Sequence, residues 1–321
     1  MSKIYHSVTE LVGKTPLVEL DRFEKINELK NQNAHILAKV EYFNPIGSAK
    51  DRIVLKILQD AEKAGKINKN TTVVEVTSGN TGIAAAAFCA VRGYKARFYI
   101  QDWVSVERKK VIKAFGAELR TIGDIPEVQK VLDETNNDFF AATAALKNHL
   151  RSEKNLFFID QAVNPSNAAA HYESTGKELW DDTDGKIDIL VAAVGTGGTL
   201  SGSGKYLKEK NPDIKIVAVQ PTVTDQTIIG VHNFTDVPSD RVPANLNRSL
   251  VDEVFTVLPE QAFWGARTAA KNEGLLVGTS SGAALYAAAE VAKRPENKGK
   301  NIAVILVDTG LRYLSTDLFQ I

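Results

Sequence analysis

Hydrophobic positions along the chain follow two alternating patterns. Short runs rich in β-branched residues, typical of buried strands, alternate with longer stretches in which apolar residues recur at helical spacing. In the first part of the chain these segments are, in order, HILAKV (35–40), AKDRIVLKILQDAEKAG (49–65), TTVVEVT (71–77), GIAAAAFCAVRG (82–93), ARFYI (96–100) and SVERKKVIKAFG (105–116). The alternation predicts β-α-β units and a mostly parallel sheet.

The same alternation resumes after a less regular middle segment. The later segments are LFFID (156–160), PSNAAAHYESTGKELWDD (165–182), DILVAAVG (188–195), TLSGSGKYLKEKN (199–211), IKIVAVQ (214–220) and NIAVILV (301–307). Residues 123–152 have weak periodicity, and we expect one or two mobile helices there, joining the two halves. A chain of 321 residues with this pattern predicts two α/β domains.

Composition narrows the kind of partner. The chain has 39 basic and 39 acidic residues, so its zero formal charge gives no electrostatic reason to expect nucleic acid or an anionic membrane as a partner. A small molecule is the expected partner. The longest apolar run, residues 83–91, is too short to span a membrane, and the segment MSKIYHSV lacks the apolar core of a secretory signal. We therefore expect a cytoplasmic protein.

Cysteine and histidine usage gives no sign of a metal centre. The single cysteine, Cys89, lies in an alanine-rich run and is interpreted as a small buried hydrophobe. The five histidines show no metal-ligand spacing, and no acidic residue is spaced to complete a ligand set: His6, His35, His149, His171 and His232. We expect no structural or catalytic metal.

Two turns at predicted strand ends are candidates for anion binding. The turn TSGNTG (77–82) offers hydroxyls, an amide and backbone N–H groups to a carboxylate or phosphate, although simple helix capping by Ser78, Asn80 or Thr81 is the alternative. The glycine-rich stretch VGTGGTLSG (194–202) presents backbone N–H groups that few side chains obstruct, which suits a phosphate.

A dinucleotide site is the competing interpretation of the second turn. Gly195, Gly197 and Gly202 approximate the dinucleotide-binding spacing, but the interval is two residues too long. Such a site also needs an acid at the end of the next strand, where this chain has Gln220, and no Walker lysine follows. Both nucleotide interpretations are therefore weakened.

Two further turns complete the candidate site. In GTSSGAA (278–284), Ser280 or Ser281 either caps the following helix or faces a ligand. In NPIGSAKDR (44–52), Ser48 and Asp51 predict a capping box that places Lys50 in the first helical turn, where burial and the helix dipole would lower its pKa. The four turns together offer a phosphate site, a carboxylate site, a hydroxyl group and a lysine of lowered pKa. This combination suits pyridoxal phosphate with an amino acid beside it.

Five motifs in order give the chain a family resemblance. NPIGSAKDR, TSGNTGI, GTGGT, EGLLVGTSSGAA and RYLST stand at nearly the spacing found in cysteine synthases (O-acetylserine sulfhydrylases), which are tryptophan-synthase-β-like pyridoxal-phosphate enzymes. The chain resembles this family over nearly its whole length. The resemblance implies two open, twisted, mostly parallel α/β domains with the cofactor in the cleft between them. Residues 46–152 would form the smaller mobile domain that binds the substrate carboxylate, and residues 1–45 with 153–321 the larger domain that holds the cofactor phosphate.

The resemblance also implies a role for each motif residue. Lys50 would form the Schiff base and later remove the substrate α-proton, Asn80 would bond the cofactor ring oxygen, and Ser280 would face the pyridine nitrogen. The implied substrate-carboxylate ligands are Thr77, Ser78, Gly79, Asn80, Thr81 and Gln161. The implied phosphate ligands are Gly195, Thr196, Gly197, Gly198 and Thr199.

The implied reaction is β-elimination to an α-aminoacrylate followed by addition of a nucleophile, with O-acetyl-L-serine and sulfide giving L-cysteine and acetate. A homodimer is expected, and serine acetyltransferase, which family members can bind through its C-terminal tail, is a candidate partner. A non-catalytic homologue serving as a binding protein is the alternative of a different class, and the intact Lys50 argues against it.

The chain departs from the family pattern at several positions. The loop 222–238 is shorter than usual and contains His232 and Asn233, which motivates cysteine as an alternative donor, releasing hydrogen sulfide and forming serine, lanthionine or cystathionine. Val76 replaces the usual proline, Leu311 replaces the usual glutamate, and the middle segment lacks the G-x-K-G turn. None of these changes removes a residue assigned to cofactor chemistry.

Overall fold

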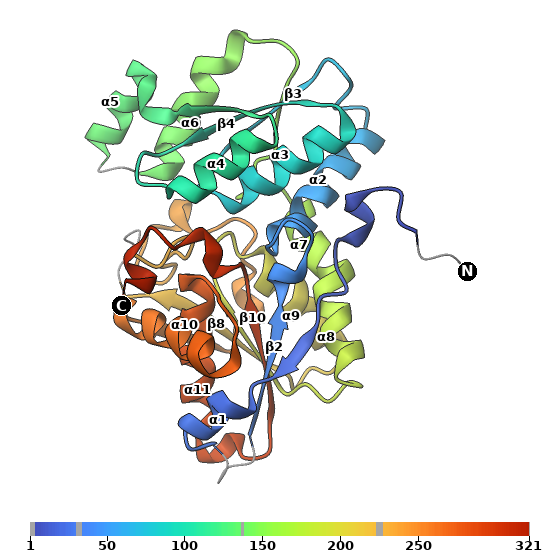
Figure 1. The fold of residues 1–321 in the computed structure, drawn as a ribbon, viewed down its shortest axis with the longest axis vertical. Helices are drawn as coiled ribbons and strands as arrows, with labels where there is room; N and C mark the ends of the chain where they lie inside the picture. The colour runs from blue at the N-terminus through green and yellow to red at the C-terminus, as the bar shows by residue number, and fades with distance from the viewer. Residues whose placement is uncertain (1–3, 30–33, 136–137, 223–226, 321) are drawn as a thin grey trace.

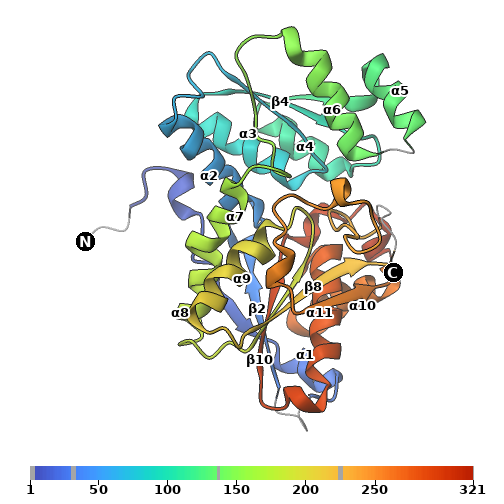
Figure 2. The same cartoon turned by 180° about the vertical axis from the view of Figure 1, so that it is seen from behind.

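Two β-sheets with helices on both faces make up the fold (Figures 1 and 2). The computed structural model describes residues 4–29, 34–135, 138–222 and 227–320. The smaller sheet lies at one end of the molecule and the larger sheet at the other, with helix α7 between them (Figure 1). The expectation of two open, mostly parallel α/β units is confirmed.

The larger sheet has six strands, of which only the first is antiparallel to its neighbour. In spatial order they are β1 (Leu17–Glu19), β2 (His35–Val40), β10 (Asn301–Leu306), β7 (Ile189–Ala193), β8 (Lys215–Pro221) and β9 (Glu253–Val257). In the register of the central strand, Ile302 pairs with Ile36 on one side and with Ile189 on the other. Apart from Asn301 at the start of β10, strands β10 and β7 are apolar because both faces of the sheet are covered.

Two layers of helices cover the larger sheet (Figure 2). They are α1 (Asp21–Ile26), α7 (Ser166–His171), α8 (Lys177–Asp182), α9 (Gly198–Lys210), α10 (Pro259–Glu273) and α11 (Thr279–Ala292). Alternate residues of β10 serve the two layers: Val304 packs in the core with α10 and α11, whereas Ala303 and Ile305 pack in the core with α8 and α9.

The smaller sheet has four parallel strands. In spatial order they are β5 (Glu118–Thr121), β4 (Lys95–Ile100), β3 (Thr72–Val76) and β6 (Leu156–Phe158). On one face lie α2 (Lys50–Lys63), α3 (Asn80–Arg92) and α4 (Val106–Ala114), and on the other lie α5 (Pro126–Glu134) and α6 (Phe139–His149).

The smaller sheet extends beyond the domain boundary expected at residue 152. Strand β6 pairs in parallel with β3, with Thr72 opposite Leu156, so this strand is part of the smaller unit. Helices α5 and α6 pack Val128, Leu132 and Leu146 onto the face formed by Val74 and Val76. The middle segment therefore covers a sheet face of the smaller unit as well as connecting the two halves.

Cys89 is fully buried in α3, as its alanine-rich surroundings predicted. Burial raises the pKa of the Cys89 thiol to about 12, so the reactive thiolate is scarce at neutral pH. We expect a thiol reagent to label the native protein at pH 8 only as fast as the protein unfolds, and to label it at once in denaturant. Rapid stoichiometric labelling of the native protein would contradict this expectation.

Candidate active site

A cavity of about 320 Å³ lies between the two sheets and gathers most of the predicted site residues. The residues named from the sequence that line it are Lys50, Ser78, Asn80, Thr81, Gln161, Gly195, Thr196, Gly197, Thr199, His232 and Ser280. Four helices begin beside it, α2, α3, α9 and α11, and strands β3 and β7 end there. Helix N-termini at the carboxyl ends of parallel strands favour binding of an anionic ligand.

Lys50 is the first residue of α2 and is partly buried in the cavity wall. Its position is fixed by the backbone, because Ala49 N–H donates to Val307 and Ser48 forms a bridge with Asp308 at the end of β10. Burial lowers the pKa of the Lys50 amine below its ordinary value of 10.5, although the carboxylates of Asp308 and Glu41 act in the opposite direction. A lowered pKa makes a neutral, nucleophilic amine more available.

The capping box predicted at Ser48 and Asp51 has a different form. Ser48 Oγ accepts the Lys50 N–H at 3.3 Å, but Asp51 Oδ2 accepts from Ile46 N–H at 2.7 Å instead of from Ser48. The N–H of Ile46 can reach this carboxylate because the chain turns sharply at Gly47, whose φ is +86°. Asp51, in the first turn of α2, therefore stabilises the turn that precedes Lys50.

The residues of the turn TSGNTG have two roles: some stabilise the turn and others line the cavity. Thr77 Oγ1 accepts from Gly79 N–H at 3.0 Å and from Gly82 N–H at 3.2 Å, so it caps α3 while Ser78, Asn80 and Thr81 line the cavity. Gly79 is the N-cap residue, with a φ of +140° that disfavours any side chain. Neither Thr77 nor Gly79 lines the cavity, which leaves them to shape the turn.

The glycine-rich turn places the N-terminus of α9 at the cavity. Gly197 is the N-cap residue with a φ of +83°, and a Cβ on it would lie 2.6 Å from the backbone of Leu246. A Cβ on Gly198 would lie 1.9 Å from Asn167 Oδ1. Gly198 does not itself line the cavity, so its lack of a side chain serves the packing of Asn167 against the turn.

Two residues of α7, which the sequence interpretation missed, hold the threonines of this turn. Asn167 Nδ2 donates to Thr196 Oγ1 at 2.9 Å, and His171 Nε2 lies 3.1 Å from Thr199 Oγ1. Both side chains are buried, and burial lowers the pKa of His171 to about 3, so its ring is neutral. The only signal in the sequence was the polar character of these positions in an otherwise apolar helix face.

The serine turn and the atypical loop also reach the cavity. Ser280 lines it, whereas Ser281 Oγ accepts from Val307 N–H at 2.9 Å and so serves the fold. His232 lines the cavity too, and burial lowers its pKa. Residues 223–226 of the loop 222–238 lie outside the described residues. Val76 and Leu311, the two single replacements of family residues, do not line the cavity.

Glu75 is a buried acid in the cavity wall and gives a pH prediction. Burial, with the charge of Asp160, raises the pKa of Glu75 from 4.5 to about 8. Between these values the folded state keeps a proton that the unfolded state releases, so this group makes stability fall as pH rises from about 4.5 to about 8. We expect Glu75→Gln to remove that dependence, so that its melting temperature relative to the unchanged protein rises from pH 5 to pH 8. Parallel melting curves over this range would contradict the expectation.

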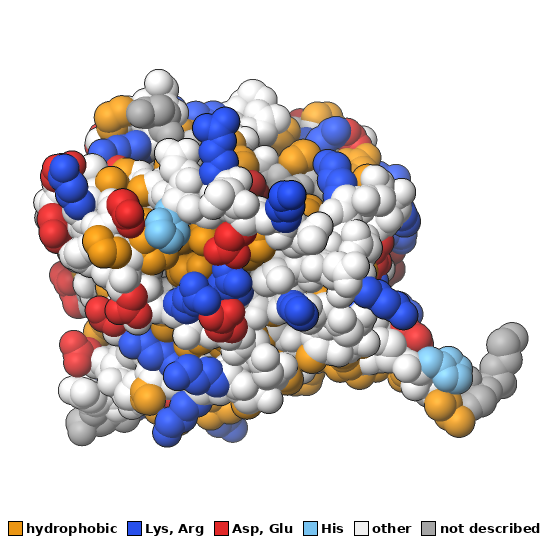
Figure 3. Space-filling view, turned by 90° about the horizontal axis from the view of Figure 1, so that it is seen from above, with side chains coloured by type: hydrophobic (Ala, Val, Ile, Leu, Met, Phe, Trp, Pro, Cys, Tyr) orange, Lys and Arg blue, Asp and Glu red, His pale blue; other side chains and the backbone are white. Residues whose placement is uncertain are grey.

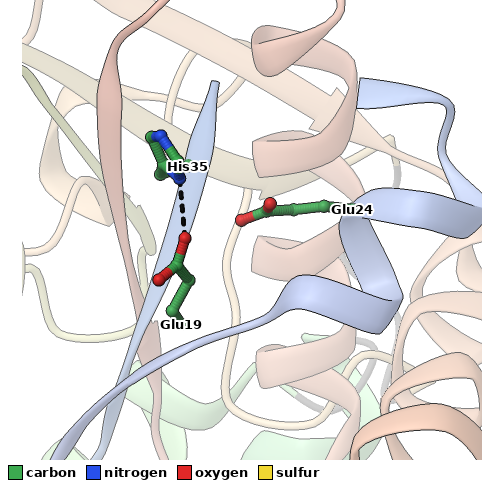
Figure 4. A group of neighbouring side chains, drawn as sticks. All are labelled: Glu19, Glu24 and His35. Atoms are coloured by element: carbon green, nitrogen blue, oxygen red, sulfur yellow. Dashed lines mark hydrogen bonds and ion pairs between the residues drawn. The ribbon is translucent and has the colours of Figure 1, made fainter. Parts of the chain in front are cut away.

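One group of side chains outside the cavity has metal-like proximity. The ligand atoms of Glu19, Glu24 and His35 all lie within 4.8 Å of one another (Figure 4), a set that sequence spacing did not indicate. Protein partners account for these side chains: His35 Nδ1 is 2.6 Å from Glu19 Oε1, and Glu24 Oε1 accepts from Ile36 N–H at 2.7 Å. None of the three lines the cavity.

The charges of the described side chains on the surface visible in Figure 3 do not form a patch of one sign that would attract a charged macromolecule. Seen from the end that carries the smaller sheet, basic and acidic side chains are interspersed over the visible face (Figure 3). Within the described residues no helix combines the length and the apolar character needed to cross a membrane.

Comparison with known proteins agrees with this site. Residues 8–308 match the family described as "Pyridoxal-phosphate dependent enzyme". A cysteine synthase of Buchnera aphidicola subsp. Schizaphis graminum is 39% identical, with 100% of this chain and 97% of that protein aligned. The solved O-acetyl serine sulfhydrylase isoform 3 of Entamoeba histolytica has a TM-score of 0.85 and 37% identity over 100% of this chain and 93% of that one.

A third similar protein has a different activity in its name. It is a hydrogen sulfide-producing enzyme of Fusobacterium nucleatum, with a TM-score of 0.82 and 35% identity over 97% of this chain and 100% of that one. The chain thus belongs to the pyridoxal-phosphate dependent enzymes and, among them, to the cysteine synthase family.

The residues present fit pyridoxal 5'-phosphate. The cavity offers a lysine amine of lowered pKa for the aldehyde, and the N-terminus of α9 for the phosphate. It also offers the uncharged hydroxyl of Ser280 for the ring nitrogen. A volume of about 320 Å³ suits a ligand of this size.

Proposed function

We propose that the protein catalyses β-replacement on a β-substituted L-alanine, converting O-acetyl-L-serine and sulfide to L-cysteine and acetate. The observation that carries the proposal is the position of Lys50: its amine, with a lowered pKa, lies in the same cavity as the N-termini of α3, α9 and α11. The cysteine synthase and O-acetyl serine sulfhydrylase relatives support the choice of substrates.

The proposed chemistry assigns the proton steps to Lys50. Pyridoxal 5'-phosphate, when bound, supplies an electron-withdrawing ring that acidifies the bond between the substrate α-carbon and its hydrogen. Lys50 holds the cofactor covalently in the resting enzyme, takes the α-proton from the substrate and returns it at the end. Its partly buried amine, positioned by the backbone at Ser48 and Ala49, suits this role.

The proposal assigns the remaining predicted residues to binding. Asn80 faces the cofactor ring oxygen, and Ser280 the ring nitrogen. The phosphate is proposed to bind at the turn 195–199, where Gly195, Thr196, Gly197 and Thr199 line the cavity and Gly198 keeps the turn packed against Asn167. The substrate carboxylate is proposed to bind at the turn 77–81, together with Gln161. In this turn Ser78, Asn80 and Thr81 line the cavity, and Thr77 and Gly79 give the turn its shape. The hydrogen bond of 2.5 Å between Thr81 Oγ1 and Gln161 Oε1 supports a shared role for these two side chains.

We also propose that the smaller unit closes over the substrate. Residues 46–152, with β6 added to them, form the moving unit in this proposal, and residues 1–45 with the rest of the chain hold the cofactor phosphate. Closure would keep water away from the reacting carbon atoms.

The proposal is tested with purified protein reconstituted with pyridoxal 5'-phosphate. We expect cysteine and acetate to form in equal amounts from O-acetyl-L-serine and sulfide, and the visible absorption band of the cofactor to change when O-acetyl-L-serine is added alone. A protein that binds the cofactor but forms no cysteine, and shows no spectral change, would contradict the proposed reaction.

Cysteine as the donor is the second candidate function. It would release hydrogen sulfide and form serine, lanthionine or cystathionine, and two observations favour it: His232 of the atypical loop lines the cavity, and one structural neighbour is a hydrogen sulfide-producing enzyme. Assaying sulfide release from L-cysteine under the same conditions separates the two donors. No sulfide from cysteine would eliminate this candidate.

The proposal extends to assembly and location. We propose a homodimer in the cytoplasm, with serine acetyltransferase as a binding partner. Light scattering after size-exclusion chromatography measures the first property, and a mass of about 35 kDa, that of a single chain, would contradict the dimer. Titration with a peptide of the acetyltransferase C-terminal tail measures the binding of serine acetyltransferase.

A further inference from the structure

Asp308 follows β10 and lies at the junction of three site segments. Its backbone bridges to Ser48, two residues before Lys50, and accepts the N–H of Gly278 at the start of α11. Its side chain is fully buried. A Cβ on Gly278 would lie 2.3 Å from Asp308 Oδ1, so the glycine leaves the room that this carboxylate occupies.

The second oxygen of this carboxylate holds Asn80. Asp308 Oδ2 accepts from Asn80 Nδ2 at 2.7 Å and from the Tyr313 hydroxyl at 2.8 Å. At the other end of the same amide, Arg312 Nη1 donates to Asn80 Oδ1. A carboxylate can only accept hydrogen bonds and a guanidinium can only donate them. The Asn80 amide is therefore held in one of its two orientations.

The charge of the carboxylate is balanced by groups from both units. Arg108, from α4 of the smaller unit, places Nη2 3.8 Å from Asp308 Oδ2, and its guanidinium lies 4.3 Å from the centre of the Tyr313 ring. Arg312 bonds the same amide that Asp308 bonds. Two guanidinium groups thus lie around the contact between Asp308 and Asn80.

We propose that Asp308 is a positioning residue which, with Arg312, fixes Asn80 so that an N–H donor faces the cavity and not the amide oxygen. Nδ2 carries two hydrogens, and Asp308 takes one of them. The second is left for an acceptor in the cavity that Asn80 lines, such as the ring oxygen of pyridoxal 5'-phosphate. The inference rests on the proposed function, which places Asn80 at that oxygen.

The test compares cofactor affinity with fold stability in the apoprotein. The dissociation constant for pyridoxal 5'-phosphate and the melting temperature are measured for Asp308→Ala, for Asn80→Asp and for the exchange variant Asn80→Asp with Asp308→Asn. Asp188→Asn is the matched control, because Asp188 accepts from Asn301 N–H at the opposite end of β10, away from the cavity.

We expect Asp308→Ala to weaken cofactor binding about tenfold, since one hydrogen bond to a charged group no longer orients the amide. Asn80→Asp alone is expected to lower the melting temperature, because two carboxylates then face each other. The exchange variant keeps the bond between positions 80 and 308 with donor and acceptor reversed. Its melting temperature is expected to recover, while its cofactor affinity stays at least about tenfold weak.

The exchange variant keeps the inference testable even if Asp308→Ala does not fold. An exchange variant that binds the cofactor as tightly as the unchanged protein would overturn the inference, as would a folded Asp308→Ala with unchanged affinity. These measurements need no turnover. If the unchanged protein binds the cofactor but forms no cysteine, the proposed function is contradicted and the inference about Asp308 is not.

Discussion

Replacing Lys50 with alanine is expected to reduce cysteine formation by roughly 10²- to 10⁴-fold from the loss of proton transfer alone. The amine lies in the cavity wall with a lowered pKa, and the other cavity-lining lysine, Lys147, is paired with Asp160 at 2.5 Å. No other amine near the reacting atoms is therefore free to replace it among the residues that line the cavity. The measurement is the rate of cysteine formation in protein supplemented with excess pyridoxal 5'-phosphate.

The absorption spectrum supplies an independent check of the same variant. The visible band of the lysine-bound cofactor should be absent in Lys50→Ala, while the cofactor can still bind without a covalent link. Lys147→Ala is the matched control and should keep the band, because its amine is engaged by Asp160. A Lys50→Ala protein with the band and activity of the unchanged enzyme would refute the assignment of the lysine.

The second large effect is expected at Gly198. An added Cβ would lie 1.9 Å from Asn167 Oδ1, and Asn167 can move only by breaking its bonds to Gln161 O and Thr196 Oγ1. We expect Gly198→Ala to lower the free energy of unfolding by about 1–3 kcal/mol, as overpacking in a core does. Cofactor affinity should fall by at least about tenfold, because 1.4 kcal/mol corresponds to a factor of ten.

Gly204, two turns later in the same helix, is the matched control. A Cβ there would meet Ile216 at 3.4 Å, an ordinary contact, and the substitution should raise helix stability by about 0.5–1 kcal/mol. Chemical denaturation and cofactor titration measure both variants. Equal effects of the two substitutions would show that the contact with Asn167 does not matter.

Local patterns in the sequence carried much of the fold. Strands β2, β3, β7, β8 and β10 were predicted because they are largely buried and read as short, mostly apolar runs. Strand β9 was missed because its first four residues alternate between partly buried and exposed positions at the edge of the sheet. The placement of β6 was also missed, since the apolar run identifies a strand but not the sheet it joins.

The candidate site divides in the same way. Its positions at strand ends and helix N-termini were predicted because the topology of a parallel sheet brings such turns together. Asn167 and His171 were missed because their partners, Thr196 and Thr199, lie 29 and 28 residues away in the chain. Asp308 was missed for the same reason, since its partner Asn80 is 228 residues distant. Hydrogen bonds between distant segments leave no periodic signal in a sequence.

The pairing of β2 with β10 has a consequence for the order in which the chain folds during its synthesis. The smaller sheet needs only residues 72–158 and can form while the ribosome is still adding the second half of the protein. The larger sheet cannot be completed until residues 301–306 emerge and insert between two strands made earlier, β2 and β7. During most of the synthesis of the chain, the edge of β2 that pairs with β10 therefore has no partner. In this period the growing chain is exposed to aggregation and to chaperones.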